Sequence, residues 1–181
     1  MSLEVCWRIG GTVVVGSAFL TWALRNATPF VLFPRLASDP MHQMSRSEGL
    51  AFLAEGTRTG KLATVRPDGH PHVVPVWFVV EDEDIVFNTW HTSVKSRNLA
   101  ADTRAALVVD YEHPPYGYVV VEGEVELSND LEEVRRIATI IGGRYMGEDK
   151  ADEFGARNGV EGELAVRLHI DRLTGRDDIT G

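Results

Sequence analysis

Short polar turns between β-rich segments are the feature that most limits the folds open to this chain. An alternating segment at 61–66 is followed by the turn Pro67-Asp68-Gly69, and a second β-rich run spans 70–80. The acidic turn 81–84 then leads into a third strand at 85–89. Such short connections join antiparallel neighbours, because a parallel crossover needs about a dozen residues or more. The segment therefore predicts an antiparallel meander and excludes a βαβ unit.

The remaining periodicities place helices and further strands around this meander. The spacing of apolar residues predicts helices over 47–55, 93–101 and 129–141, the last ending at Gly142-Gly143, and a short polar helix over 149–156. Ser45 and Glu48 have the spacing of a capping box at the start of the first helix. Strands are predicted at 104–111, 118–127 and 163–173, which brings the total to six. The sequence predicts an α+β fold built on a small six-stranded antiparallel barrel with peripheral helices.

The N-terminal residues differ from the rest of the chain. Residues 9–24 contain no charged side chain and are flanked by arginines. This run is short for a transmembrane helix, which needs about 20 apolar residues. Three interpretations remain open: a membrane anchor or uncleaved signal, a packed extension, or a start assigned too early, with Met41 or Met44 as the natural first residue. We therefore divide the chain into an apolar extension, 1–43, and one domain, 44–181.

Composition excludes several classes of function. The 27 acidic residues outnumber the 18 basic ones, and a net charge of −9 disfavours nucleic-acid binding. The single cysteine, Cys6, excludes an internal disulfide framework and a zinc site built on cysteine pairs. His70 and His72 share one face of a strand, but no third ligand is spaced to complete a metal site, so we predict none. No nucleophile motif supports a hydrolase.

A candidate anion site lies where the strand at 85–89 leads into the helix at 93–101. The first N–H groups of a helix have no intrahelical partners, and the helix dipole favours an anion there. Thr92 and Ser93 add hydroxyl groups, and Lys95 and Arg97 add positive charge. The segment fits two interpretations, a phosphate cradle or a solvated basic helix start with a serine cap, and the residues alone leave both open.

The run at 70–80 contains a break that suits a ligand. Pro75 cannot donate a hydrogen bond to a neighbouring strand, so this strand lies at an edge or is interrupted there. The break frees nearby backbone groups for the polar edge of a planar ligand. Trp77 and Phe78 point to opposite faces, so one can pack in the core while the other lines a cleft.

Two segments, GKLATVRPDGHPHVVPVWF (60–78) and IVFNTWHTSVKSRNLAADTRAAL (85–107), resemble the flavin-binding split-barrel superfamily that includes pyridoxamine-phosphate oxidases. More narrowly, they resemble its actinobacterial branch, which uses the deazaflavin coenzyme F420. The likeness spans roughly residues 44–175. It implies a six-stranded split barrel and a homodimer with two cofactor sites at the subunit interface. One central lysine, in place of the additional arginines of many FMN-using members, favours F420, with FMN as the alternative.

The resemblance also implies which residues bind the cofactor. Ser93, Lys95 and Arg97 would hold its phosphate, and residues of two adjacent strands would flank its ring system. The complete predicted site consists of Thr64, Val65, Arg66, Val74, Pro75, Val76, Trp77, Ser93, Lys95 and Arg97. Catalytic residues stay unassigned, because the cofactor itself carries the hydride chemistry. His91 and Tyr116 are the candidates if a side chain acts as acid or base.

The implied reaction is hydride transfer from the reduced deazaflavin to an unsaturated small molecule, such as a biliverdin-like tetrapyrrole or a quinone. The expected setting is cytoplasmic, with membrane association only if residues 9–24 form a true anchor. Two alternatives stay open. One is an FMN-dependent enzyme that resembles pyridoxamine 5'-phosphate oxidase. The other is a non-catalytic module that carries a cofactor or a haem-like ligand.

Overall fold

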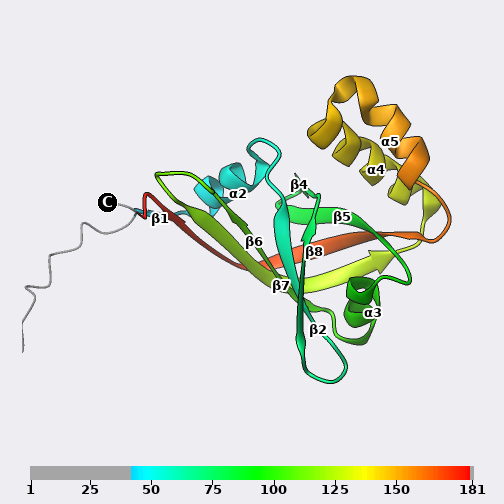
Figure 1. Cartoon of the computed structure of the whole chain (residues 1–181), viewed down its shortest axis with the longest axis horizontal. Coiled ribbons are helices and arrows are strands. Elements are labelled where there is room, and N and C mark those ends of the chain that lie inside the picture. The colour runs from blue at the N-terminus through cyan, green and yellow to red at the C-terminus, as the bar shows by residue number, and fades with distance from the viewer. Residues whose placement is uncertain (1–41, 180–181) are drawn as a thin grey trace, which may run out of the picture. The chain divides into compact units, whose positions relative to one another are not determined.

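The computed structural model describes residues 42–179 of the chain (Figure 1). The interpretations of the N-terminal extension, including an anchor at 9–24, therefore lie outside the described residues, apart from His42 and Gln43. Within 42–179, no helix is both long enough and apolar enough to cross a membrane.

One antiparallel sheet dominates this part of the chain. The order of its strands is β3-β2-β6-β7-β8-β5-β4, and β1 pairs with the far end of β8. The eight strands found within residues 42–179 are β1 (His42–Met44), β2 (Gly60–Val65), β3 (Pro71–Val76), β4 (Val79–Glu81), β5 (Asp84–Trp90), β6 (Arg104–Asp110), β7 (Tyr118–Ser128) and β8 (Glu163–Asp177). The predicted meander is present as the antiparallel pairs β2–β3 and β4–β5.

The connection between β3 and β4 explains why the sheet curls. These two strands lie at opposite ends of the strand order, yet Trp77 and Phe78 alone separate them in the chain. Two residues can link the two edges only if the sheet bends round until the edges meet. Within 42–179 no ladder of hydrogen bonds joins β3 to β4, so the barrel stays open along this line, which we call the seam.

The predicted number of six strands is wrong, and the seam is the main reason. The run 70–80 was expected to form one strand, but it divides into β3 and β4 just after Pro75. Strand β1 has only three residues, too few to show alternation in the sequence. Its pairing with β8 extends that strand to Asp177, beyond the predicted end at 173. Pro75 does lie on an edge strand, as predicted.

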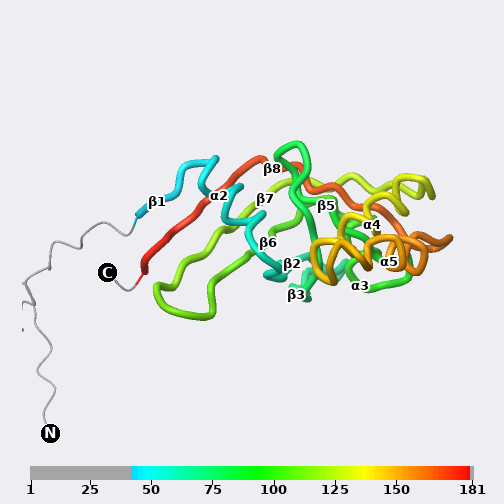
Figure 2. The backbone as a smooth tube through the Cα atoms, turned by 90° about the horizontal axis from the view of Figure 1, so that it is seen from above, coloured from blue at the N-terminus to red at the C-terminus, as the bar shows by residue number. Residues whose placement is uncertain are grey.

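The helices gather at the two ends of the sheet. They are α2 (Arg46–Ala54), α3 (Val94–Ala101), α4 (Leu131–Met146), the 3-10 turn η1 (Glu148–Lys150) and α5 (Ala151–Asn158). Figure 2 shows α3, α4 and α5 together at one end, with β1 and α2 towards the other. The capping box at the start of α2 is confirmed, because Ser45 and Glu48 each accept from the other's backbone N–H.

Helix α4 runs past Gly142 and Gly143, where the sequence predicted its end. A Cβ atom at Gly142 would lie 2.5 Å from the Cβ of Phe154, so glycine is needed for α5 to pack directly on α4. The helix ends before Gly147, whose φ of 104° favours glycine. The same residue type thus serves close packing at one position and helix termination at another.

Alternate residues of the strands fill the barrel. Leu107, Val109, Val119 and Val121 on the neighbouring strands β6 and β7 are fully buried. Phe78, at the seam, is also fully buried, whereas the adjacent Trp77 is 39% exposed. The expectation that one of these aromatic residues enters the core while the other stays accessible is confirmed.

An ion-pair network fastens α4 to the sheet. The carboxylate of Glu81 on β4 accepts hydrogen bonds from Arg136 on α4, at 2.6 and 3.0 Å, and from Arg167 on β8, at 2.6 Å. Arg136 first, and then Arg167, hold the pKa of Glu81 at about 2, although partial burial acts in the opposite direction. A depressed folded-state pKa stabilises the fold above the ordinary value of 4.5, and this contribution disappears as the pH falls towards 2.

We expect Glu81→Gln to lower the free energy of unfolding by about 2 kcal/mol at pH 7 and by much less at pH 2. Urea titrations of both proteins at the two pH values measure this difference. Glu83→Gln is the matched control, because Glu83 pairs with Arg46 at an exposed position and should change stability little. An equal loss at both pH values would show that the charge of Glu81 is not the cause.

Candidate functional site

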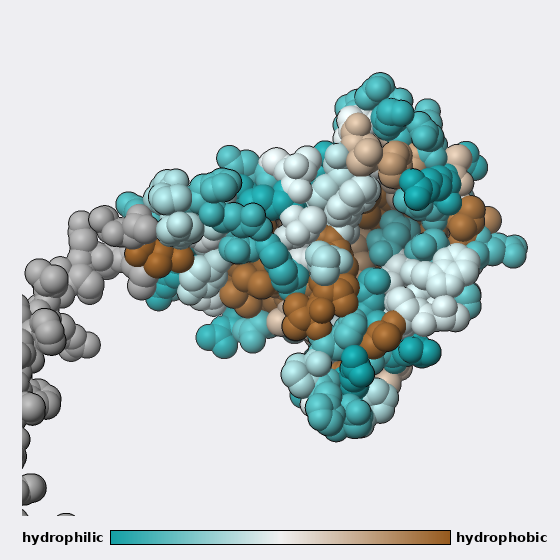
Figure 3. Space-filling view, in the orientation of Figure 1, coloured by the Kyte–Doolittle hydropathy of each residue, from teal (hydrophilic) through white to brown (hydrophobic). Residues whose placement is uncertain are grey.

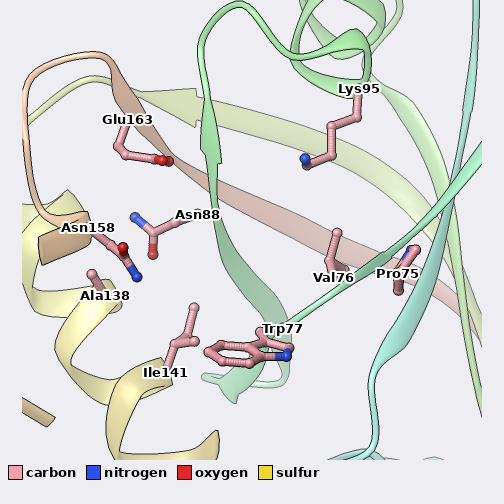
Figure 4. A pocket seen from close by; sticks show the side chains of 9 residues that line it. All are labelled: Pro75, Val76, Trp77, Asn88, Lys95, Ala138, Ile141, Asn158 and Glu163. Carbon is pink, nitrogen blue, oxygen red and sulfur yellow. The ribbon is translucent and has the colours of Figure 1, made fainter. Parts of the chain in front are cut away.

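A cavity of about 340 Å³ opens beside the seam. Six elements or their flanking residues contribute to it: β3, β5, α3, α4, α5 and the first residue of β8. Its lining residues, drawn in Figure 4, are Pro75, Val76, Trp77, Asn88, Lys95, Ala138, Ile141, Asn158 and Glu163. One end of the cavity is charged and polar, and the other end is aromatic and aliphatic.

Lys95 supplies the positive charge of the cavity. It lies in the first turn of α3 and directs its ammonium group into the cavity (Figure 4). Within the described part of the chain it makes no hydrogen bond or ion pair. Burial lowers the pKa of Lys95, and the attraction of Glu163 partly opposes this effect. A half-buried ammonium group with no bonded partner there is available to an anionic ligand.

Hydrogen bonds fix the helix that carries Lys95. The hydroxyl of Ser93 caps α3 by accepting from the N–H of Ser96 at 3.2 Å, and it lies 3.0 Å from the hydroxyl of Thr89 on β5. The buried amide of Asn98 donates to the hydroxyl of Thr64 on β2 at 3.0 Å. Because α3 is tied to two strands, the barrel sets the backbone position from which the Lys95 side chain extends.

Three polar residues of the cavity, Asn88, Asn158 and Glu163, were not predicted as site residues. Asn88 on β5 donates from Nδ2 to the carbonyl of Val134 at 3.1 Å, which fixes the orientation of its amide. Its Oδ1 is buried and has no hydrogen-bond partner among the described residues. Glu163 points its carboxyl group across the cavity towards Lys95 (Figure 4). Burial raises the pKa of Glu163, while Lys95 and His91 act in the opposite direction.

Trp77 and Ile141 form the apolar end of the cavity. The indole of Trp77 stacks on the ring of Tyr145, with centroids 4.8 Å apart and planes 3° from parallel. The Tyr145 hydroxyl donates to the carbonyl of Arg58 at 2.9 Å and lies 3.3 Å from the backbone N–H of Phe78, from which it accepts. Trp77 therefore packs on Tyr145, whose hydroxyl is fixed by hydrogen bonds to Arg58 and to Phe78.

The structure distributes the predicted site residues over different environments. Four of them line the cavity: Pro75, Val76, Trp77 and Lys95. Two line a separate hollow on the sheet: Thr64 and Val65. Arg66 lies on the exposed β2–β3 turn, Val74 packs against the core, Ser93 serves as the helix cap, and Arg97 is exposed on α3.

The two candidate acid–base residues lie outside the cavity. The Nδ1 atom of His91 is 2.8 Å from the carbonyl oxygen of Gly162, and the side chain borders a neighbouring hollow. Tyr116 lies in the β6–β7 loop, at the end of the sheet opposite α3 (Figure 1). His70 and His72 belong to no group of three or more metal-binding side chains among residues 42–179.

Known proteins are similar to this chain in sequence and in fold. Residues 46–174 match the pyridoxamine 5'-phosphate oxidase family. A 5a,11a-dehydrotetracycline/5a,11a-dehydrooxytetracycline reductase of Streptomyces rimosus is 31% identical over 133 residues, which are 65% of this chain and 86% of that protein.

Two solved structures extend the comparison. A conserved hypothetical protein of Mycobacterium tuberculosis has a TM-score of 0.66 and 28% identity, over 75% of this chain and 86% of its own. An F420 reductase has a TM-score of 0.53 and 28% identity, over 67% of this chain and 93% of its own. The match to the family model covers most of the chain and the whole cavity. The chain therefore belongs to the pyridoxamine 5'-phosphate oxidase family, a family of split-barrel oxidoreductases.

Proposed function

We propose that this oxidoreductase uses F420 and transfers a hydride from the reduced deazaflavin to an unsaturated small-molecule acceptor. The observation that carries the proposal is the ammonium group of Lys95, half-buried in the cavity at the seam without a bonded partner in the described chain. The likeness to the 5a,11a-dehydrotetracycline/5a,11a-dehydrooxytetracycline reductase, at 31% identity, and to the F420 reductase, at 28% identity, supports this choice.

The cavity residues fit such a cofactor. A deazaflavin coenzyme carries an anionic phosphate and a planar ring with N–H groups. Lys95 would bind the phosphate, and the buried Oδ1 of Asn88 would accept a hydrogen bond from an N–H group. Trp77 and Ile141 would exclude water beside the ring. The bound cofactor supplies the hydride, and the protein supplies orientation and electrostatics.

Fluorescence titration of the full chain with purified F420 and with FMN tests the proposal. We expect F420 to bind with a Kd below about 100 μM, equivalent to roughly −5.5 kcal/mol, and more tightly than FMN. Tighter binding of FMN would favour the FMN-dependent alternative. Binding of F420 without reduction of any quinone or tetrapyrrole acceptor would favour a carrier module. Failure of both cofactors to bind would contradict an oxidoreductase of either kind.

We also propose that two copies of the chain associate through the second hollow, which is lined by Thr64 and Val65, two of the residues expected to flank a cofactor at the subunit interface. This hollow, about 590 Å³, is lined by residues of β2, β3, β6, β7 and β8, among them the small residues Ala63, Ala106 and Gly123. Arginines and carboxylates both line it, so a two-fold axis can set each charge against the opposite charge of the partner. Figure 3 shows hydrophobic residues exposed over the strands near the middle of one face.

Ala106→Asp is expected to convert a dimer into a monomer at micromolar concentration, because it places an unpaired charge in the centre of this surface. Light scattering coupled to gel filtration measures the mass of each protein. Thr103→Asp, at an exposed position just before β6, is the control and should leave the dimer intact. A wild-type protein that elutes as a monomer would refute this interface.

A further inference from the structure

The cavity contains few groups that can exchange a proton. Of its nine lining residues, two are titratable, Lys95 and Glu163. His91, which also influences the pKa of Glu163, borders the adjoining hollow, and its Nδ1 atom lies 2.8 Å from the carbonyl oxygen of Gly162. If Lys95 is bound to the phosphate of a cofactor, Glu163 is the remaining group of the lining that can give up a proton.

A proton is required by the chemistry of the proposed function. Hydride addition to one end of a conjugated double bond moves its electron pair to the other end, where negative charge develops. Breaking the O–H bond of a carboxylic acid delivers a proton to that end and leaves a carboxylate, which regains its proton from solvent. The acceptor gains one hydride and one proton, and the cofactor is oxidised by two electrons.

We propose that Glu163 is the catalytic acid of this cavity and that binding of a phosphorylated cofactor at Lys95 favours the protonated form of Glu163. The inference rests on the proposed function. Its geometric basis is the placement of the two side chains, which point towards each other across the cavity with no ion pair between them (Figure 4).

The charges around Glu163 explain the coupling. Lys95 on α3 and His91 in the β5–α3 loop are the titratable groups that attract its carboxylate. Its other neighbours in the cavity are neutral, namely Asn88 on β5, Ala138 on α4 and Asn158 on α5. A phosphate at Lys95 cancels the main attraction and adds negative charge, and burial already raises the pKa of Glu163. Both effects favour the protonated acid in the loaded enzyme.

Calorimetric titration with F420 and with FMN, in two buffers of different ionisation enthalpy, measures the protons taken up on binding. Because the phosphate monoester of FMN itself titrates near pH 6, the decisive quantity is the difference between wild type and Glu163→Gln. We expect wild type at pH 6.5 to take up about 0.3 to 1 proton more than the variant. At pH 8 we expect the variant to bind about tenfold more tightly than wild type, because it lacks the repelling carboxylate.

Glu161→Gln is the matched control, since Glu161 is exposed and lies outside the cavity. It should behave as wild type in both measurements. With any acceptor that wild type reduces, Glu163→Gln should lower kcat by about 100-fold or more, with a smaller change in KM.

Cofactor binding with equal proton uptake in wild type and Glu163→Gln would overturn the inference while leaving the proposed function intact. An unchanged kcat in Glu163→Gln would also overturn it. If neither cofactor binds wild type, the proposed function fails first, and the role of Glu163 fails with it.

Discussion

Lys95→Ala is expected to weaken the binding of F420 and of FMN by about 30-fold, or about 2 kcal/mol. Under the proposed function, the variant would remove a charge-assisted contact to the cofactor phosphate, and such contacts contribute about 1.5 to 3 kcal/mol. Fluorescence titration with each cofactor measures the two dissociation constants. The same fold-change is expected for both cofactors, because the phosphate is the feature that they share.

Lys150→Ala removes the same charge at an exposed position in η1, outside the cavity, and is the matched control. Its affinity should equal that of wild type within a factor of two, and Lys95→Arg should retain most of the affinity. If Lys150→Ala weakens binding as much as Lys95→Ala, the overall charge of the protein governs binding, and the phosphate site at Lys95 is wrong.

Arg144→Met is expected to lower the free energy of unfolding by about 4 kcal/mol. The guanidinium of Arg144 donates to three backbone carbonyls, those of Leu53, Gly56 and Phe78, at 2.8, 3.0 and 2.7 Å. Methionine fills a similar volume but leaves these acceptors without their donor. Chemical denaturation followed by far-UV circular dichroism measures the change.

Arg135→Met, at an exposed position on the same helix, is the control and should change stability by less than about 0.5 kcal/mol. Arg144 also lies against Phe78 and beside Tyr145, the residue on which Trp77 stacks. We therefore expect Arg144→Met to change the near-UV circular dichroism of the folded protein as well. Equal stability of the two variants would mean that Arg144 does not hold α2, α4 and the seam together.

The predictions for Lys95 and Arg144 are linked, because residues that stabilise the fold also shape the cavity that contains Lys95. Arg144 joins α4 to the residues around the seam, and Glu81 joins α4 to β4 and β8. Helix α4 contributes Ala138 and Ile141 to the lining of the cavity. Removal of Arg144 or Glu81 is therefore expected to shift α4 and to change the apolar end of the cavity.

Features set by neighbouring residues were predictable from the sequence. The capping box of Ser45 and Glu48, the tight turn after β2 and the edge position of Pro75 follow from backbone chemistry over a few residues. The opposite burial of Trp77 and Phe78 was expected from strand alternation and is present, although these two residues form the link between β3 and β4 and belong to neither strand. Lys95 stood out because a helix start in an acidic chain is an unusual place for a lysine.

The sequence by itself thus determined an α+β chain with an antiparallel meander and a cation at the start of α3. Only the tertiary structure decided that β3 and β4 are separate strands across an open seam, and that Glu163 faces Lys95 there. It also decided that Gly142 serves helix packing instead of helix termination. The physical reason is range: turns, caps and alternation act between near neighbours, whereas Lys95 and Glu163 meet only after the sheet has curled and brought distant segments together.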